Sequence, residues 1–181
     1  MRRKDVTPEF IKRAFALSLF EIMQEKKFED ITITEICLKA GFGRTSYYRY
    51  YDNDREKLLL YLGHVEWAKY KDQYPDEAAQ DGLAFLNCMY HYKNYFLTLH
   101  KQGLDSTIVK VMFNEFGGVR GEMSESSYAK AFVAGGTFGI AYEWILGGCK
   151  ETPRQIKSKL DLGLRKEIQD AEVLNAINHR F

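Results

Sequence analysis

Apolar residues recur every three or four positions along most of the chain, the spacing of one face of an α-helix. Glycine or proline interrupts the pattern between segments. We therefore predict an all-α fold of about nine helices. Their expected ranges are 8–26, 33–40, 44–51, 54–70, 77–91, 93–101, 105–116, 127–146 and 153–168, and residues 169–181 either extend the last helix or fray.

The stretch 32–51 predicts two short helices joined by a tight turn. Thr32 is followed three residues later by Glu35, the spacing of a capping box at a helix start. Gly41 stands where a helix often ends, because glycine reaches positive φ without a Cβ clash. This is the length of a helix-turn-helix motif with glycine at the corner. An amphipathic helical hairpin with a solvated face fits the same periodicity.

The second helix of this pair, residues 44–51, separates into two faces. Tyr47 and Tyr51 are four positions apart and can pack against the first helix. The positions left outside are Arg44, Thr45, Tyr48 and Arg49. Arginine and hydroxyl side chains suit phosphate oxygens and base edges in a DNA major groove.

Further residues extend the pattern without a gap over about fifty positions. They are Ile11, Ala14, Phe20, Phe28-Glu29, Ile33-Thr34-Glu35-Ile36, Ala40-Gly41 and the run 44–51. This segment resembles the N-terminal domain of the tetracycline-repressor-like (TetR) family of bacterial transcription regulators. The resemblance implies a ligand-responsive regulator, which we expect to be a cytoplasmic repressor. It would bind palindromic operator DNA as a homodimer, with residues 44–51 as the recognition helix.

The residues assigned to double-stranded DNA are Thr32, Gly43, Arg44, Thr45, Ser46, Tyr48, Arg49, Tyr50 and Arg55. Three positions depart from the family: Gly43 replaces its usual Ser, Tyr50 its frequent His, and Asp54 its common Lys. An acid at position 54 would repel phosphate. This motivates a second hypothesis, a TetR-like protein without operator binding that acts as a coactivator through a protein partner.

We divide the chain into a DNA-binding domain, residues 1–60, and an effector-binding and dimerisation domain, residues 61–181. Small residues four apart in segment 127–146 let another helix approach closely, either inside one chain or across a dimer. We favour the dimer, because the last two helices of TetR proteins pair with their copies. The residues assigned to this interface are Ala131, Gly135, Gly139, Tyr142, Ile156, Leu160 and Leu164.

Methionine and aromatic residues in the middle helices can line an apolar pocket. They are Tyr61, His64, Met89, Tyr90, Met112, Phe113, Phe116 and Phe138. In the TetR family a small effector commonly binds between such helices, and the effector of this chain stays unknown. The same residues can simply fill the core.

Composition and charge narrow the classes of function that the chain can have. The net charge of +1 provides no global basic field, although residues 1–51 hold ten Lys and Arg against seven Asp and Glu. The three cysteines are far apart and lack the spacing of metal ligands, and no catalytic motif is present. We therefore predict that the protein has no cofactor and no metal and is not an enzyme. A helical enzyme or ligand carrier is kept as the third hypothesis. We also expect no signal peptide and no membrane partner. The basic arm Arg2-Arg3-Lys4 is either a mobile tail or reaches DNA.

Overall fold

The computed structural model describes residues 7–78, 84–116 and 125–178, without the side chains of 77–78, 115–116, 125–126, 130 and 167–178. The basic arm at residues 2–4 lies outside this part of the chain. The elements are α1 (Pro8–Ile22), η1 (Phe28–Asp30), α2 (Ile33–Ala40), α3 (Arg44–Tyr51), α4 (Glu56–Gln73), α5 (Pro75–Ala78), α6 (Ala84–His91), α7 (Lys93–Lys101), α8 (Asp105–Phe116), α9 (Glu125–Leu146) and α10 (Pro153–Asn178). Every element in the described ranges is helical, which confirms the predicted all-α class and, setting aside the one-turn α5, its nine helices.

Several helix ends differ from the prediction. Helix α1 ends at Ile22, and the Met23 and Lys26 carbonyls beyond it are bound by the side chain of Gln102, which follows α7. Helix α4 begins at Glu56, whose N–H donates to the Asp54 carboxylate at 2.9 Å. Within the range 77–91, α5 includes residues 77–78 and α6 begins at Ala84, while residues 79–83 lie outside the described part of the chain. Helix α10 continues to Asn178, which is one of the two outcomes expected for its end.

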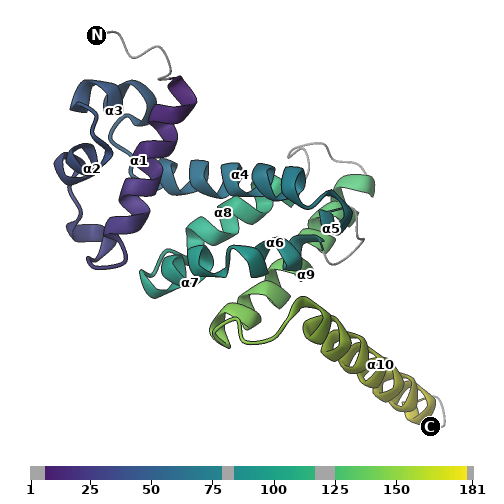
Figure 1. Cartoon of the computed structure of the whole chain (residues 1–181). Helices are drawn as coiled ribbons and strands as arrows, with labels where there is room; N and C mark the ends of the chain where they lie inside the picture. Colours follow the sequence, from purple (N-terminus) through teal and green to yellow (C-terminus); the bar gives the residue numbers. More distant parts are fainter. Residues whose placement is uncertain (1–6, 79–83, 117–124, 179–181) are drawn as a thin grey trace.

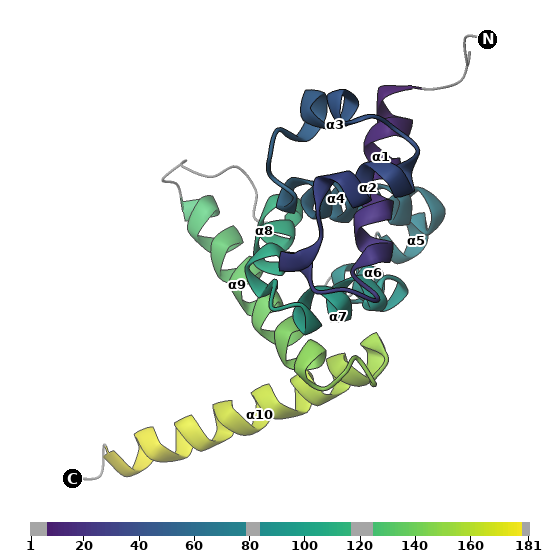
Figure 2. The same cartoon turned by 90° about the vertical axis from the view of Figure 1, so that its left-hand side faces the viewer.

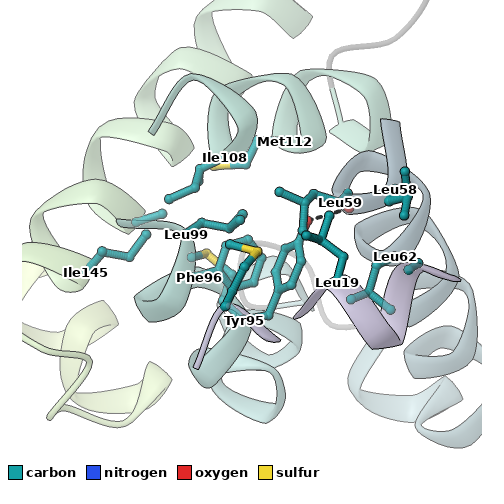
Figure 3. Packing of buried hydrophobic residues seen from close by; sticks show 14 of the residues in the cluster. Leu19, Leu58, Leu59, Leu62, Tyr95, Phe96, Leu99, Ile108, Met112 and Ile145 are labelled. Carbon is teal, nitrogen blue, oxygen red and sulfur yellow. Dashed lines mark hydrogen bonds between the residues drawn. The ribbon is translucent and has the colours of Figure 1, made fainter. Parts of the chain in front are cut away.

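Helix α4 is shared by both halves of the molecule, since it packs against α1 on one side and α8 on the other. Figure 1 shows α1, α2 and α3 at one end of α4, while α8 lies along its length. Leu58, Leu59 and Leu62 of α4 are buried between the two groups. In Figure 3 Leu59 lies next to Tyr95 of α7, whose hydroxyl donates to the Leu59 carbonyl at 2.7 Å. One continuous apolar core therefore links the N-terminal helices to the rest.

Most of α10 lies apart from this core, which the helix joins near its start through the buried Ile156. Figures 1 and 2, seen at right angles, both show it leaving the end of α9 and running away from the other helices. Thr152 and Gln155 form a capping box at its start, with a bond of 2.8 Å from the Thr152 N–H to the Gln155 side chain. No helix among the described residues is both long enough and apolar enough to cross a membrane.

Candidate nucleic-acid interface

The first half of the motif, α2, is set by its capping box. The Glu35 N–H donates to the Thr32 hydroxyl at 3.2 Å, and the Thr32 N–H donates to the Glu35 carboxylate at 2.8 Å. The Lys26 ammonium bonds the other oxygen of that carboxylate at 2.8 Å. This ammonium first, and the Thr32 bonds second, lower the pKa of Glu35 to about 2. Thr32 is exposed, but its hydroxyl is used to hold the helix start.

The turn between the helices is closed by Gly41, which ends α2 with φ at 72°, in the left-handed region. Its N–H and that of Phe42 bond the last carbonyls of α2, as in a glycine-capped helix. Gly43 then precedes α3 without any side-chain cap. The local signals in the sequence therefore account for the whole turn, and α3 has its predicted ends.

Two tyrosine rings anchor α3. Tyr47 and Tyr51 are buried, and both rings meet the edge or face of Phe15 on α1, at centroid distances of 5.4 and 6.4 Å. The Tyr51 hydroxyl donates to the Lys12 carbonyl at 3.0 Å. Burial raises the pKa of Tyr47 to about 12 and also raises that of Tyr51. Neither hydroxyl is available to DNA, and α3 is fixed against α1 along one side.

The opposite side of α3 is open to solvent. Arg44, Thr45, Tyr48 and Arg49 are exposed there. The Arg44 guanidinium donates to the Tyr48 hydroxyl at 3.2 Å and lies 5.8 Å from the centre of its ring. The bond to Tyr48, first among the causes, raises the pKa of Arg44. This face thus presents two charged donors and two hydroxyls on a short helix.

The other residues assigned to DNA occupy less open positions. Ser46 and Tyr50 are half-buried, and the Lys12 ammonium lies 5.8 Å from the centre of the Tyr50 ring. Arg55 is turned inward: it donates to the Phe28 carbonyl at 2.8 Å and to the Ile31 carbonyl, and its guanidinium lies over the Phe28 ring. Arg55 therefore ties the start of α4 to η1, in place of the DNA contact expected from the sequence.

Most lysines of the N-terminal helices have carboxylate partners in the same half of the molecule. The pairs are Lys12–Glu9, Lys26–Glu35, Lys39–Glu21 and Lys57–Asp52, at 2.7 to 3.0 Å. Among the described residues, Arg44 and Arg49 have no such ion pair. The positive charge open to a polyanion is therefore concentrated on α3, while exposed Asp52 and Asp54 lie just beyond its C-terminal end.

The residues predicted to line an effector pocket have different surroundings, and the pocket stays a prediction. Met89 and Met112 are buried in the core, and the Tyr90 ring stacks on Trp144. The hydroxyl of Tyr61 donates to Glu9 on α1 at 2.9 Å, and His64 is exposed. Of the others, Phe113 is half-buried, Phe138 stacks on Tyr142, and the Phe116 side chain lies outside the described residues.

Two of the hollows between the described residues bear on the predicted pocket and dimer interface. A cavity of about 20 Å³ lies between α4, α6, α7 and α8, next to Gly63, Cys88 and Val111. A groove of about 440 Å³ separates α9 from α10 and is lined by apolar side chains that include Ile156, Leu160 and Leu164. The signal for the first cavity is Gly63 itself, a glycine inside a helix, which the sequence analysis did not use.

The residues assigned to a dimer interface differ in exposure along α9 and α10, and Ile156, Leu160 and Leu164 line the groove between the two helices. Ala131, Gly135 and Gly139 are exposed, and a Cβ added at either glycine would meet nothing within 4 Å. Close packing of these glycines inside one chain is therefore not seen in the described part of the molecule. Leu164 is exposed, Tyr142 and Leu160 are half-buried, and Ile156 is buried. Large apolar neighbours are also open to solvent: Tyr128, Phe132, Val133 and Leu162.

No group of three or more His, Cys, Asp or Glu side chains among the described residues is arranged to hold a metal ion. Neither the models of known protein families nor the curated proteins include a match to this chain. The resemblance to TetR regulators thus stays a prediction, and the geometry of α3 and of the α9–α10 surface carries the argument on function.

Proposed function

We propose that the chain is a ligand-responsive transcription regulator that binds operator DNA as a homodimer and acts as a repressor. The observation that carries the proposal is the division of α3 into an anchored and an open face. An eight-residue helix is about 12 Å long, and the major groove is about 12 Å wide. Arg44 can reach guanine acceptors, and the Tyr48 hydroxyl can reach a phosphate or a base edge.

The charge distribution supports specific rather than general affinity for DNA. The two arginines of α3 without carboxylate partners concentrate positive charge where the groove would lie. The paired lysines contribute little net field beyond a Debye length of about 8 Å at physiological salt. We therefore expect weak binding to random duplexes and a small dependence on salt, because few phosphates are neutralised.

The exposed apolar surface of α9 and α10 supports a dimer. Exposed apolar side chains such as Phe132 on α9 and Leu162 on α10 are costly to leave in water. The glycine positions on α9 let the backbone of a second helix approach. A two-fold dimer uses the same patch on both copies. It would place two α3 helices about 34–36 Å apart, so that each copy reads one half-site of a palindrome.

The contact between α4 and α8 supports a response to a ligand. A Cβ at Gly63 would lie 2.9 Å from Val111, so the two helices already touch beside the small cavity. A molecule that enlarged this cavity would separate α4 from α8. Because α4 follows α3 directly, such a ligand would bind the state with displaced recognition helices and shift the population toward it.

Operator selection tests the proposal. Duplexes bound by the full chain are selected from a random pool and measured by fluorescence anisotropy against an unrelated duplex. Arg44→Ala should weaken binding roughly 5- to 150-fold, the worth of one good bidentate base contact. Arg154→Ala removes an exposed arginine on α10 and should leave the affinity unchanged. Equal affinity of the wild-type chain for every duplex would refute operator binding.

A coactivator that works through a protein partner is the second candidate, favoured by the acidic end of α3. Asp52 and Asp54 are exposed there, Lys57 is paired with Asp52, and Arg55 is turned inward. A phosphate approaching this end would meet two exposed carboxylates, which oppose the attraction of Arg49 in the last turn of α3. Isolation of a stable complex with another transcription protein, while selection recovers no DNA sequence, would favour this candidate over the first.

A further inference from the structure

In the turn between α1 and η1, three backbone groups are bound by one side chain from the other half of the molecule. Gln102 follows α7, and its amide nitrogen donates to the Met23 carbonyl at 2.7 Å and to the Lys26 carbonyl at 3.0 Å. Its amide oxygen accepts a bond of 3.0 Å from the Phe28 N–H. A single amide thus satisfies three backbone groups in residues 23–28.

These backbone groups need such a partner. The last carbonyls of a helix have no partner inside it, and a glycine in the left-handed conformation usually helps to satisfy them. Residues 23–28 contain no glycine. A primary amide supplies two donors and an acceptor on one rigid plane, whereas a carboxylate of the same size supplies acceptors only. The residue type at position 102 therefore matches the set of groups that it binds.

Gln102 is itself firmly placed. Its backbone N–H bonds the carbonyls of Thr98 and Leu99 at 3.0 and 3.2 Å, which ends α7. The turn from α7 to α8 is closed by a bond of 2.7 Å between the His100 ring and the Asp105 carboxylate. Leu99 is buried in the core shown in Figure 3. The position of the amide therefore follows the α7–α8 turn.

The bound turn leads straight into the recognition motif. Phe28 begins η1, the Arg55 guanidinium lies 4.7 Å from the centre of its ring, and Arg55 also bonds its carbonyl. Two residues after η1, Thr32 caps α2, and α2 positions α3. A displacement of the α7–α8 turn would therefore reach α2 and α3 by a route separate from the body of α4.

We propose that Gln102 is a positioning residue that sets the orientation of α2 and α3 relative to the rest of the chain. The inference rests on the proposed function for its effect on DNA, but its structural part can be measured without DNA. When the amide is lost, residues 23–31 should open more often, and the recognition helix should sample orientations that do not fit an operator.

Amide hydrogen exchange of the free full-length protein tests the structural part. In Gln102→Ala, peptides covering 23–31 should exchange roughly ten-fold faster or more, because buried backbone groups lose their partners. Peptides of α9 should be unchanged. Gln102→Glu keeps an acceptor for the Phe28 N–H but loses both donors, so it should give a similar increase. Lys101→Ala, an exposed neighbour at the same helix end, is the matched control.

Two exchange results would overturn the proposal. Wild-type protection of 23–31 in Gln102→Ala would show that the amide does not hold the turn. A parallel loss of protection in every helix would show a general stabilising role without a positioning effect. The predicted pattern is a local increase that Lys101→Ala does not reproduce.

Operator affinity tests the functional part. Gln102→Ala should lower it roughly five- to ten-fold while the dependence on salt stays unchanged, because no phosphate contact is removed. Unchanged affinity despite faster local exchange would overturn the effect on DNA binding. If the wild-type chain binds no operator, the proposed function fails, and the exchange pattern alone decides whether Gln102 positions the two helices.

Discussion

Phe15 of α1 and Phe132 of α9 are the same residue type on two long helices, but their side chains differ in exposure to solvent. Phe15 is fully buried and touches the rings of Phe42, Tyr47 and Tyr51, whereas Phe132 is 83% exposed. Around Phe15 a single chain supplies every surface that the ring needs. Around Phe132 it supplies almost none.

The same contrast holds for two glycines within helices. Gly63 of α4 is pressed against Val111 of α8, with no room for a methyl group, whereas Gly135 of α9 faces open space. Helices α1 to α4, here called the N-terminal unit, thus pack most of their apolar residues within one copy of the chain. Their exposed residues are therefore candidates for binding a ligand such as DNA. The exposed apolar residues of α9 and α10 instead call for a second surface, and we assign that surface to another copy of the chain.

Phenylalanine replacement at the two sites should give the largest difference. Phe15→Ala removes a buried ring and should lower the free energy of unfolding by about 3–5 kcal/mol. Phe132→Ala should change the stability of the single chain by no more than about 0.5 kcal/mol, since its side chain is exposed. Its effect should instead fall on self-association. Denaturant unfolding and analytical ultracentrifugation of both variants measure the two quantities.

Protein concentration separates the two kinds of effect. For a wild-type dimer the unfolding midpoint rises with concentration, because association stabilises the folded state. This dependence should weaken in Phe132→Ala and persist in any Phe15→Ala protein that remains folded. A wild-type chain that sediments as a single copy at all concentrations would break the comparison, since α9 would then be complete in one chain.

Glycine-to-alanine replacement should give a smaller difference of opposite sign at the two sites. At Gly63 the added methyl group would force α4 from α8 and should cost about 1–3 kcal/mol of unfolding free energy. At Gly135 it meets no neighbour in the chain and should stabilise the dissociated protein by about 0.5–1 kcal/mol. Thermal unfolding of dilute protein measures both changes.

A dimer interface at Gly135 adds a further consequence. If a second helix approaches closely there, the gain seen in dilute Gly135→Ala should shrink or reverse at concentrations where the wild type associates. The same gain at every concentration would show that Gly135 does not lie in the interface.

The local signals in the sequence were sufficient for the motif itself. The Thr32–Glu35 pair and Gly41 fix where α2 begins and ends, and the four-residue spacing of Tyr47 and Tyr51 fixes which face of α3 is buried. All of these interactions lie within about twenty residues. Capping and helical periodicity depend on neighbours in the chain, so they can be inferred before any tertiary contact is known.

Interactions between distant segments could not be inferred in this way. Arg55 and Gln102 bind backbone carbonyls. A residue of any type at positions 23, 26, 28 and 31 would offer the same carbonyl oxygen. The sequence therefore contains no pattern that pairs them. The effector pocket stays a prediction for a related reason: methionines and aromatic residues fill cores and line cavities equally well, and only packing decides between the two.

The smallest predicted difference concerns two capping boxes, one ionisable and one neutral. Glu35 closes the box of α2, and Gln155 closes that of α10. Because the pKa of Glu35 is lowered from 4.5 to about 2 in the folded chain, its charge stabilises the fold above pH 4.5. This contribution should disappear as the pH falls from about 4.5 to about 2, when the carboxylate becomes protonated in the folded state as well.

Glu35→Gln isolates that charge, since glutamine can still form the box and only the bond of the carboxylate to the Lys26 ammonium is lost as an ion pair. The difference in unfolding free energy between wild type and variant should be present at pH 7, shrink at high salt, and vanish near pH 2. Gln155→Ala in α10 should lower stability by the same amount at every pH, because that cap carries no charge. A Glu35→Gln difference that persists unchanged at pH 2 would show that the substitution disturbs the helix start itself. The ion pair with Lys26 would then contribute nothing to the stability of the N-terminal unit.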